Sequence, residues 1–139
     1  HLMAFGEWCA ARHSLDYATL PDWWLLFDIY DRTEGRFWST VRRDAWARLH
    51  GLTVVPRLHS GRVGMAQLRQ WISNDQSRFR PGALEGLVIR RENVDWLEAR
   101  AKLVRPDFTQ AIDSHWRNRP LEWNQLDRKV SIKWGLPVA

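Results

Sequence analysis

The sequence predicts an α+β fold: a twisted, mainly antiparallel sheet with flanking helices. Strand-like apolar runs occur together with helical patterns, but not in the strict β-α-β order that a parallel sheet requires. The 139 residues suffice for one domain with a modest hydrophobic core. With 45% hydrophobic and 27% charged residues, the composition is that of an ordinary globular protein.

The first half of the chain predicts a hairpin and a helix. The near-continuous apolar run at 23–30, WWLLFDIY, indicates a buried central strand. Residues 33–35 form a turn, after which 36–39 return as a short hairpin partner. Ser39 or Thr40 can cap a helix that ends at Gly51. The apolar face of this helix is expected to consist of residues at helical spacing: Val41, Ala45, Trp46 and Leu49.

The second half predicts a short strand at 53–58 and a helix around 65–72, followed by a polar loop at 74–83 that turns at Pro81-Gly82. The apolar face of this helix is formed by Met65, Leu68, Trp71 and Ile72. Two further strands, 84–92 and 99–106, are separated by residues 93–98. Asp107 can cap a last helix over 107–116, and beyond Pro120 the pattern fades.

Basic residues outnumber acidic ones. The 21 Lys and Arg against 16 Asp and Glu give a net charge of +5, and most of the cations are arginine. Arginine forks suit phosphate, which favours a polyanionic partner such as RNA. An excess of arginine on solvated faces explains the same composition, so charge alone leaves both readings open. The arginines expected to contact nucleic acid are Arg78, Arg80, Arg91 and Arg105.

The remaining composition narrows the class of protein. A single cysteine, Cys9, fits a reducing compartment, and we expect the cytoplasm. No apolar run approaches the roughly 20 residues of a membrane span, so no membrane partner is expected. Residues 1–4 are expected to be a tag remnant rather than part of the domain.

A carboxylate and an ammonium lie on two neighbouring predicted strands. Glu85 begins EGLVIR, and Lys102 lies within RAKLVR, each among apolar residues. Such charges are costly unless they meet each other or share a ligand. A phosphate with a divalent metal would satisfy both, and Gly86 would allow a close approach to the backbone. A structural salt bridge is the alternative.

Four short motifs occur in a fixed order: FGEW, LLFDIYD, EGLVIR and AKLVR. They resemble motifs III, IIIa, IV and V of the covalent nucleotidyltransferases, more narrowly the RNA ligase family related to the second RNA ligase of phage T4. The resemblance covers about residues 5–116. It implies a partial ATP-grasp-like nucleotidyltransferase domain over 5–118, the C-terminal part of the adenylyltransferase domain. Residues 119–139 would be a tail or the start of a further element.

The resemblance also implies roles for individual residues. Glu7 would contact the ribose of bound ATP or AMP, Phe27 would stack on adenine, and Asp28 would support the strand or the pocket. Glu85 would help to hold Mg²⁺. Lys102 would contact the α-phosphate and stabilise the charge that develops there. Arg90 matches a basic position at the pocket rim.

The sequence departs from the family in its nucleophile. Relatives attack ATP with the lysine of a Lys-x-Asp-Gly motif, and this sequence contains no such motif. The second lysine of motif V is replaced by Val104, with Arg105 beside it. We therefore expect a fragment or truncated relative that is inactive alone. An uncovered sheet edge would then favour a homodimer.

Two other functions fit the same residues. One is a nucleic-acid or nucleotide-binding module that performs no catalysis. The other is a protein-interaction domain whose tryptophan-rich face docks on a partner, since ten tryptophans exceed what a core of this size needs.

Overall fold

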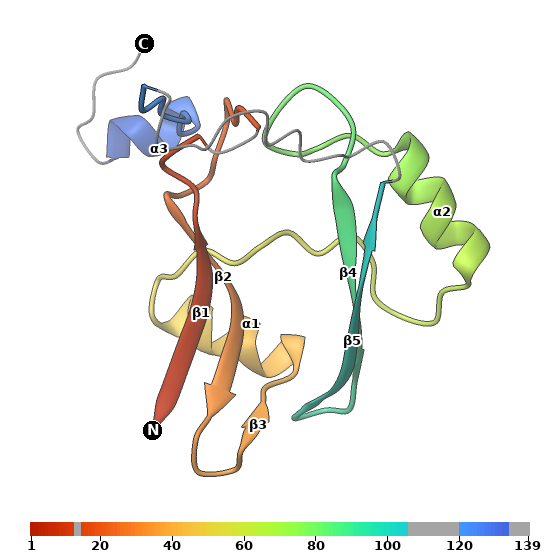
Figure 1. Ribbon diagram of the computed structural model, residues 1–139. Coiled ribbons are helices and arrows are strands. Elements are labelled where there is room, and N and C mark those ends of the chain that lie inside the picture. The colour runs from red at the N-terminus through yellow and green to blue at the C-terminus, as the bar shows by residue number, and fades with distance from the viewer. Residues whose placement is uncertain (13–14, 106–119, 134–139) are drawn as a thin grey trace. The chain divides into compact units, whose positions relative to one another are not determined.

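The structure is a computed structural model that describes residues 1–12, 15–105 and 120–133 (Figure 1). Its contacts divide the chain into two compact units. Unit 1 comprises His1–Glu7, Trp24–Val63 and Leu87–Leu103, and unit 2 comprises Trp8–Trp23, Gly64–Gly86 and Val104–Ala139.

Unit 1 contains two antiparallel sheets and one helix. Strands β1 (Leu2–Trp8), β2 (Trp24–Asp31) and β3 (Arg36–Phe37) form a sheet in the order β1-β2-β3, while β4 (Gly86–Glu92) pairs with β5 (Leu97–Val104). Helix α1 (Thr40–Leu49) lies against β2 on one face of the three-stranded sheet (Figure 1). The predicted α+β class with antiparallel pairing is therefore confirmed.

Strand β2 is the buried centre of unit 1, as its apolar run predicts. Leu26 and Ile29 are fully buried and form a core cluster with Trp38 and Ala47. The predicted strand at 53–58 is reduced to a single bridge between Leu26 and Val54. The prediction of a strand there was wrong, because Pro56 has no N–H to extend a ladder.

Helix α1 begins where predicted, with Ser39 as its N-cap, but it buries a different face. Val41 and Leu49, expected on the apolar face, are 65% and 82% exposed. The helix instead buries Ala47 together with Arg43, which is 3% exposed. Apolar spacing failed as a guide because a buried arginine with polar partners occupies the inner face.

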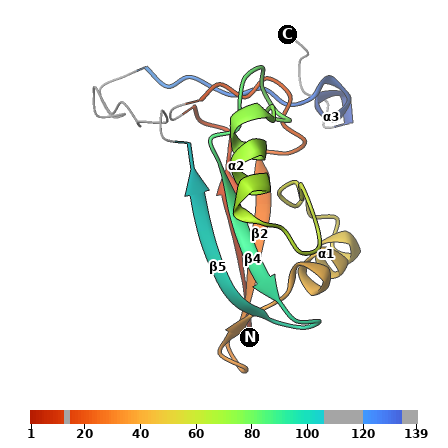
Figure 2. The same ribbon diagram turned by 90° about the vertical axis from the view of Figure 1, so that its right-hand side faces the viewer.

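Unit 2 contains helix α2 (Met65–Asn74), which is labelled in Figure 2. The helix buries the predicted residues Leu68 and Ile72. In the last described segment of unit 2, Trp123 pairs with Ala11 and Leu126 with Leu20, and α3 (Arg128–Lys133) follows. The predicted helix at 107–116 lies outside the described residues. None of the described helices is long and apolar enough to span a membrane.

Buried Asn124 joins the segments of unit 2. Its Nδ2 donates to the carbonyl oxygen of Cys9 at 2.7 Å, and its Oδ1 accepts from the backbone N–H of Tyr17 at 2.8 Å. An amide side chain can satisfy a donor and an acceptor at once, which fixes the backbone of Cys9 and of Tyr17 against the C-terminal segment.

Candidate functional site

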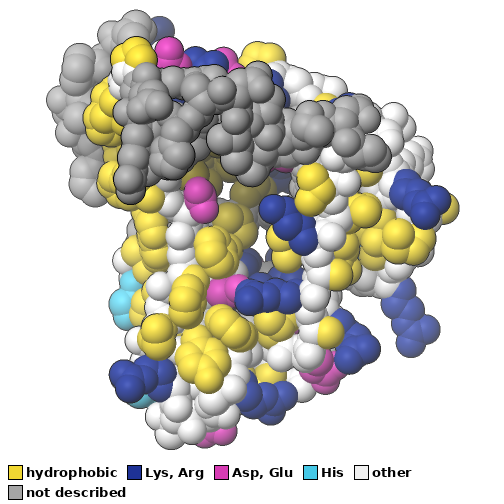
Figure 3. All heavy atoms as spheres, viewed as in Figure 1, with side chains coloured by type: hydrophobic (Ala, Val, Ile, Leu, Met, Phe, Trp, Pro, Cys, Tyr) yellow, Lys and Arg dark blue, Asp and Glu magenta, His cyan; other side chains and the backbone are white. Residues whose placement is uncertain are grey.

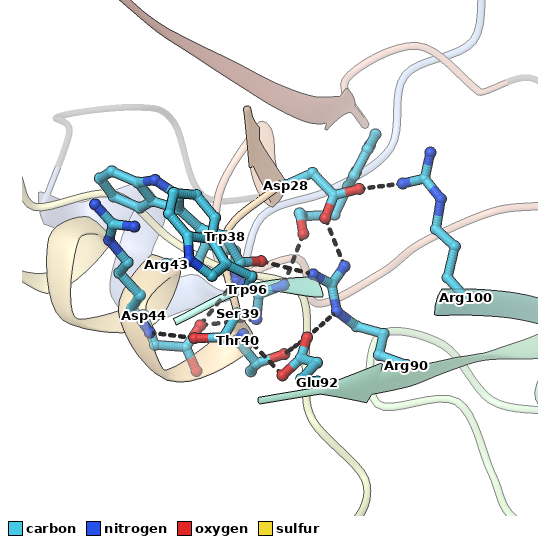
Figure 4. Close-up of polar contacts among 12 residues, drawn as sticks. Asp28, Trp38, Ser39, Thr40, Arg43, Asp44, Arg90, Glu92, Trp96 and Arg100 are labelled. Atoms are coloured by element: carbon cyan, nitrogen blue, oxygen red, sulfur yellow. Dashed lines mark hydrogen bonds and ion pairs between the residues drawn. The ribbon is translucent and has the colours of Figure 1, made fainter. Parts of the chain in front are cut away.

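A buried carboxylate connects the two sheets of unit 1. Asp28 of β2 is 2% exposed, and Nη1 of Arg90 on β4 donates to its Oδ1 at 2.5 Å. Nη1 of Arg100 on β5 donates to the second oxygen, Oδ2. Both strands of the second sheet are thereby bound to the centre of the first (Figure 4).

Arg90 extends this contact to helix α1. Its Nε donates to Oε1 of Glu92 at 2.5 Å, and its Nη2 to the carbonyl oxygen of Trp38 at 3.1 Å. Glu92 in turn accepts from the backbone N–H of Thr40 at 2.9 Å and from its hydroxyl at 2.8 Å (Figure 4). We call Asp28, Arg90, Arg100 and Glu92 the Asp28 cluster.

The contacts keep two members of the Asp28 cluster, Arg90 and Glu92, charged. Burial lowers the pKa of Arg90, but the hydrogen bonds to Glu92 and Asp28 outweigh it, so the net pKa is raised. Burial likewise raises the pKa of Glu92, and the bonds from Arg90 and Thr40 overcome it and bring the pKa below 4.5.

Burial does not alternate strictly along β2 beside Asp28. Leu26 and Ile29 belong to the same core cluster although they are three residues apart. The carbonyl oxygen of Phe27 accepts from Nη1 of the buried Arg43 at 2.7 Å. The Phe27 side chain is half-buried.

Strand β1 presents Glu7 on the sheet face away from the core. Leu2 packs on the core cluster, and a side chain at Gly6 would begin 2.3 Å from the Trp24 ring, so Leu2 and Gly6 face inward. Alternation then places Phe5 and Glu7 on the opposite face. The Phe5 ring lies 5.9 Å from the ring of Phe37 on β3, between centroids.

The sheet face that carries Phe5 and Glu7 contacts β5 through Phe37 and Arg100. The Arg100 guanidinium lies 4.9 Å from the ring centroid of Phe37 while it binds Asp28. Lys102, two residues further along β5, is on the same side of the strand as Arg100 and is exposed. Four of the predicted residues thus lie on the surfaces through which the two sheets of unit 1 face each other: Glu7, Asp28, Arg90 and Lys102.

Glu85 belongs to unit 2 and lies one residue before β4. The hydroxyl of Tyr17 donates to Oε1 of Glu85 at 3.1 Å, and the carbonyl oxygen of Glu85 accepts from the N–H of Arg105 at 3.0 Å. Burial, followed by the charge of Glu85, raises the pKa of Tyr17 far above its usual 10.0, so the phenol remains a donor. Tyr17 was missed because nothing local marks its partner, 68 residues away.

The arginines predicted for nucleic acid differ in their surroundings. Arg78 is exposed. Nε of Arg80 lies 3.6 Å from Oδ1 of Asp16. Arg91 lies 3.5 Å from Glu98 at the surface of the β4–β5 hairpin. Arg105 is half-buried. Arg78, Arg80 and Arg105 belong to unit 2, and Arg91 to unit 1.

Glu85 is the residue that the family resemblance assigns to Mg²⁺. Within the described ranges, no group of three or more His, Cys, Asp or Glu side chains could hold a metal ion. Mg²⁺ usually keeps several waters and binds one or two carboxylates together with substrate phosphates. A single half-buried carboxylate such as Glu85 therefore fits a nucleotide-bound Mg²⁺ and not a site formed by protein ligands alone.

The lowered pKa of Glu92 predicts acid-sensitive stability. A carboxylate whose folded-state pKa is depressed contributes stability above its unfolded value of about 4.5, and this is lost as the pH falls through the folded pKa. We expect urea unfolding of Glu92→Gln to depend less on pH below about 5 than that of the wild type. Glu98→Gln, on the exposed side of the same hairpin, should keep the wild-type dependence; equal profiles for Glu92→Gln and the wild type would contradict this.

Comparison with known proteins agrees with the order of the motifs. The family model described as RNA ligase matches residues 1–104, which is most of the chain. No curated protein and no solved structure gave a significant match. The matched range spans β1 to β5, including the Asp28 cluster. On this match, the chain belongs to the RNA ligase family.

Proposed function

We propose that this chain supplies the nucleotide-binding part of an RNA-joining nucleotidyltransferase. The observation that supports the proposal is the gathering of Glu7, Asp28, Arg90 and Lys102 on facing surfaces of unit 1. Family membership adds the general use of ATP and an RNA substrate. The nucleotide would lie between the two sheets, with its phosphates toward β5.

The roles follow from charge and availability. Arg90 and Arg100 are neutralised by carboxylates, so they form the frame and not the phosphate contact. Lys102 is exposed, and among the described residues it has no ion-pair partner. Its ammonium would bind the α-phosphate and stabilise the charge that develops there. Glu7 would hold the ribose and Phe27 the adenine ring.

For Glu85, which belongs to unit 2, we propose a role as a ligand of Mg²⁺. Held by the Tyr17 hydroxyl, its carboxylate keeps a second oxygen for Mg²⁺ or for a water bound to it. When bound, Mg²⁺ would neutralise phosphate charge.

The complete reaction of the family is proposed for the whole protein and not for this chain alone. It comprises adenylylation of a lysine, transfer of AMP to an RNA 5′-phosphate, and attack by a 3′-hydroxyl. Because the sequence has no Lys-x-Asp-Gly, this chain would bind nucleotide without forming the lysine adduct. The same absence favours a second candidate, a nucleotide or RNA-binding module that performs no catalysis.

Replacing Lys102 should weaken nucleotide binding. A hydrogen bond to a charged group contributes about 1.5–3 kcal/mol, so Lys102→Gln should reduce ATP affinity roughly tenfold or more in calorimetry with Mg²⁺. The matched control is Lys129→Gln, which removes the same charge from an exposed position in unit 2 and should change affinity less than about twofold. Equal weakening in both variants would show a mere charge effect and refute the assigned role.

Bound nucleotide should remain non-covalent. After incubation with labelled ATP and Mg²⁺, native filters should retain label, and denaturation in SDS should release all of it, since a lysine-AMP bond would survive the detergent. A labelled band on an SDS gel would contradict the prediction, and mass spectrometry would then locate the modified lysine among Lys102, Lys129 and Lys133.

A further inference from the structure

A second group of basic and aromatic side chains lies outside the proposed nucleotide site. Trp38, directly after β3, pairs with Trp96, directly before β5, through an isolated antiparallel bridge. The indoles of both residues are visible in Figure 4. In Figure 3, Lys and Arg side chains lie beside hydrophobic and acidic ones near the turns of β3 and of the β4–β5 hairpin.

Two arginines stack on these rings. The guanidinium carbon of Arg42 lies 4.1 Å from the ring centroid of Trp38 and 4.7 Å from that of Trp96. The guanidinium carbon of Arg36 lies 4.9 Å from the centroid of Trp96. We call Arg36, Arg42, Trp38 and Trp96 the Trp96 platform.

The platform is held in place by the start of helix α1. The buried hydroxyl of Ser39 donates to the carbonyl oxygen of Val94 at 2.7 Å. The backbone N–H of Ser39 donates to the carbonyl oxygen of Asp95 at 2.9 Å. The same hydroxyl accepts from the backbone N–H of Arg42 at 3.3 Å. One N-cap therefore fixes both the hairpin turn that carries Trp96 and the backbone that carries Arg42.

The two arginines differ from their neighbours in charge compensation. Arg43, Arg90 and Arg100 each pair with a carboxylate, whereas in the described part of the chain neither Arg36 nor Arg42 does. Asp95, beside Trp96 in the sequence, forms no ion pair with either of them there. Two positive charges are thus ordered by stacking, with no carboxylate partner among residues 1–12, 15–105 and 120–133.

We propose that the Trp96 platform binds the phosphodiester backbone of single-stranded RNA. A guanidinium that stacks through its face keeps its N–H edge available for two parallel bonds to a phosphate. Because stacking and the N-cap already restrict Arg42, little side-chain entropy is lost on binding. The choice of RNA rests on the proposed function, while the phosphate chemistry rests on the platform alone.

The test is RNA affinity as a function of salt. A short fluorescein-labelled single-stranded RNA without a 5′-phosphate is titrated with the whole chain by anisotropy, between about 50 and 200 mM salt. The Arg36→Gln/Arg42→Gln variant should bind roughly tenfold or more weakly. The slope of log affinity against log salt should become shallower by about 1.4, since each phosphate contact contributes about 0.7 for single strands.

Matched variants separate this site from general charge. Arg48→Gln/Arg57→Gln removes two exposed arginines of unit 1 and should leave RNA affinity within about twofold of wild type. Arg42→Lys keeps the charge but loses the planar fork, so it should weaken binding with little change in slope. Thermal unfolding of each variant verifies that it folds.

The outcomes distinguish this proposal from that for the nucleotide site. Equal weakening in both double variants, no weakening in either, or no RNA binding by the wild type would overturn the platform. ATP affinity is measured on the same proteins and should not change in Arg36→Gln/Arg42→Gln. Loss of RNA binding with no ATP binding in any protein would support the platform and refute the nucleotide site.

Discussion

The two sheets of unit 1 depend on the buried carboxylate of Asp28. At 2% exposure this carboxylate would be strongly destabilising without cations, and both of its cations come from the other sheet. Removing these cations while the sheets stay packed would leave a buried anion unpaired, which typically costs about 3–5 kcal/mol. Through Arg90 and Glu92 the same constraint reaches Thr40 at the start of α1, so sheet, hairpin and helix are fixed as one arrangement.

This constraint divides the basic residues into two kinds. Arg90 and Arg100 are occupied by carboxylates and give the site its rigid frame, since side chains with locked partners hold their neighbours in place. Lys102, Arg36 and Arg42 lie on the same unit without carboxylate partners among the described residues. The two proposals made above use these cations as phosphate contacts, Lys102 for a nucleotide and the two arginines for an RNA strand.

Local patterns of apolar and turn residues were enough to predict much of the fold. The pairing of side chains that lie far apart in the sequence was not predictable. The apolar run at β2, the turn at Gly35, helix α2 and the β4–β5 hairpin all follow from short-range spacing. The inner face of α1 was mispredicted because buried Arg43 is satisfied by Asp44 and by the Phe27 carbonyl. Motif order indicated the family, which the match over residues 1–104 shows.

The candidate site could be foreseen only in part. An aspartate inside an apolar strand signals a buried cation, but the sequence does not say that Arg90 and Arg100, 62 and 72 residues away, would both supply it. The most direct test is amide hydrogen exchange in Asp28→Asn, with Asp95→Asn as an exposed control. If Asp28 joins the sheets, protection in β4 and β5 falls at least tenfold in Asp28→Asn and is kept in the control. Wild-type protection of β4 and β5 in Asp28→Asn would contradict the account.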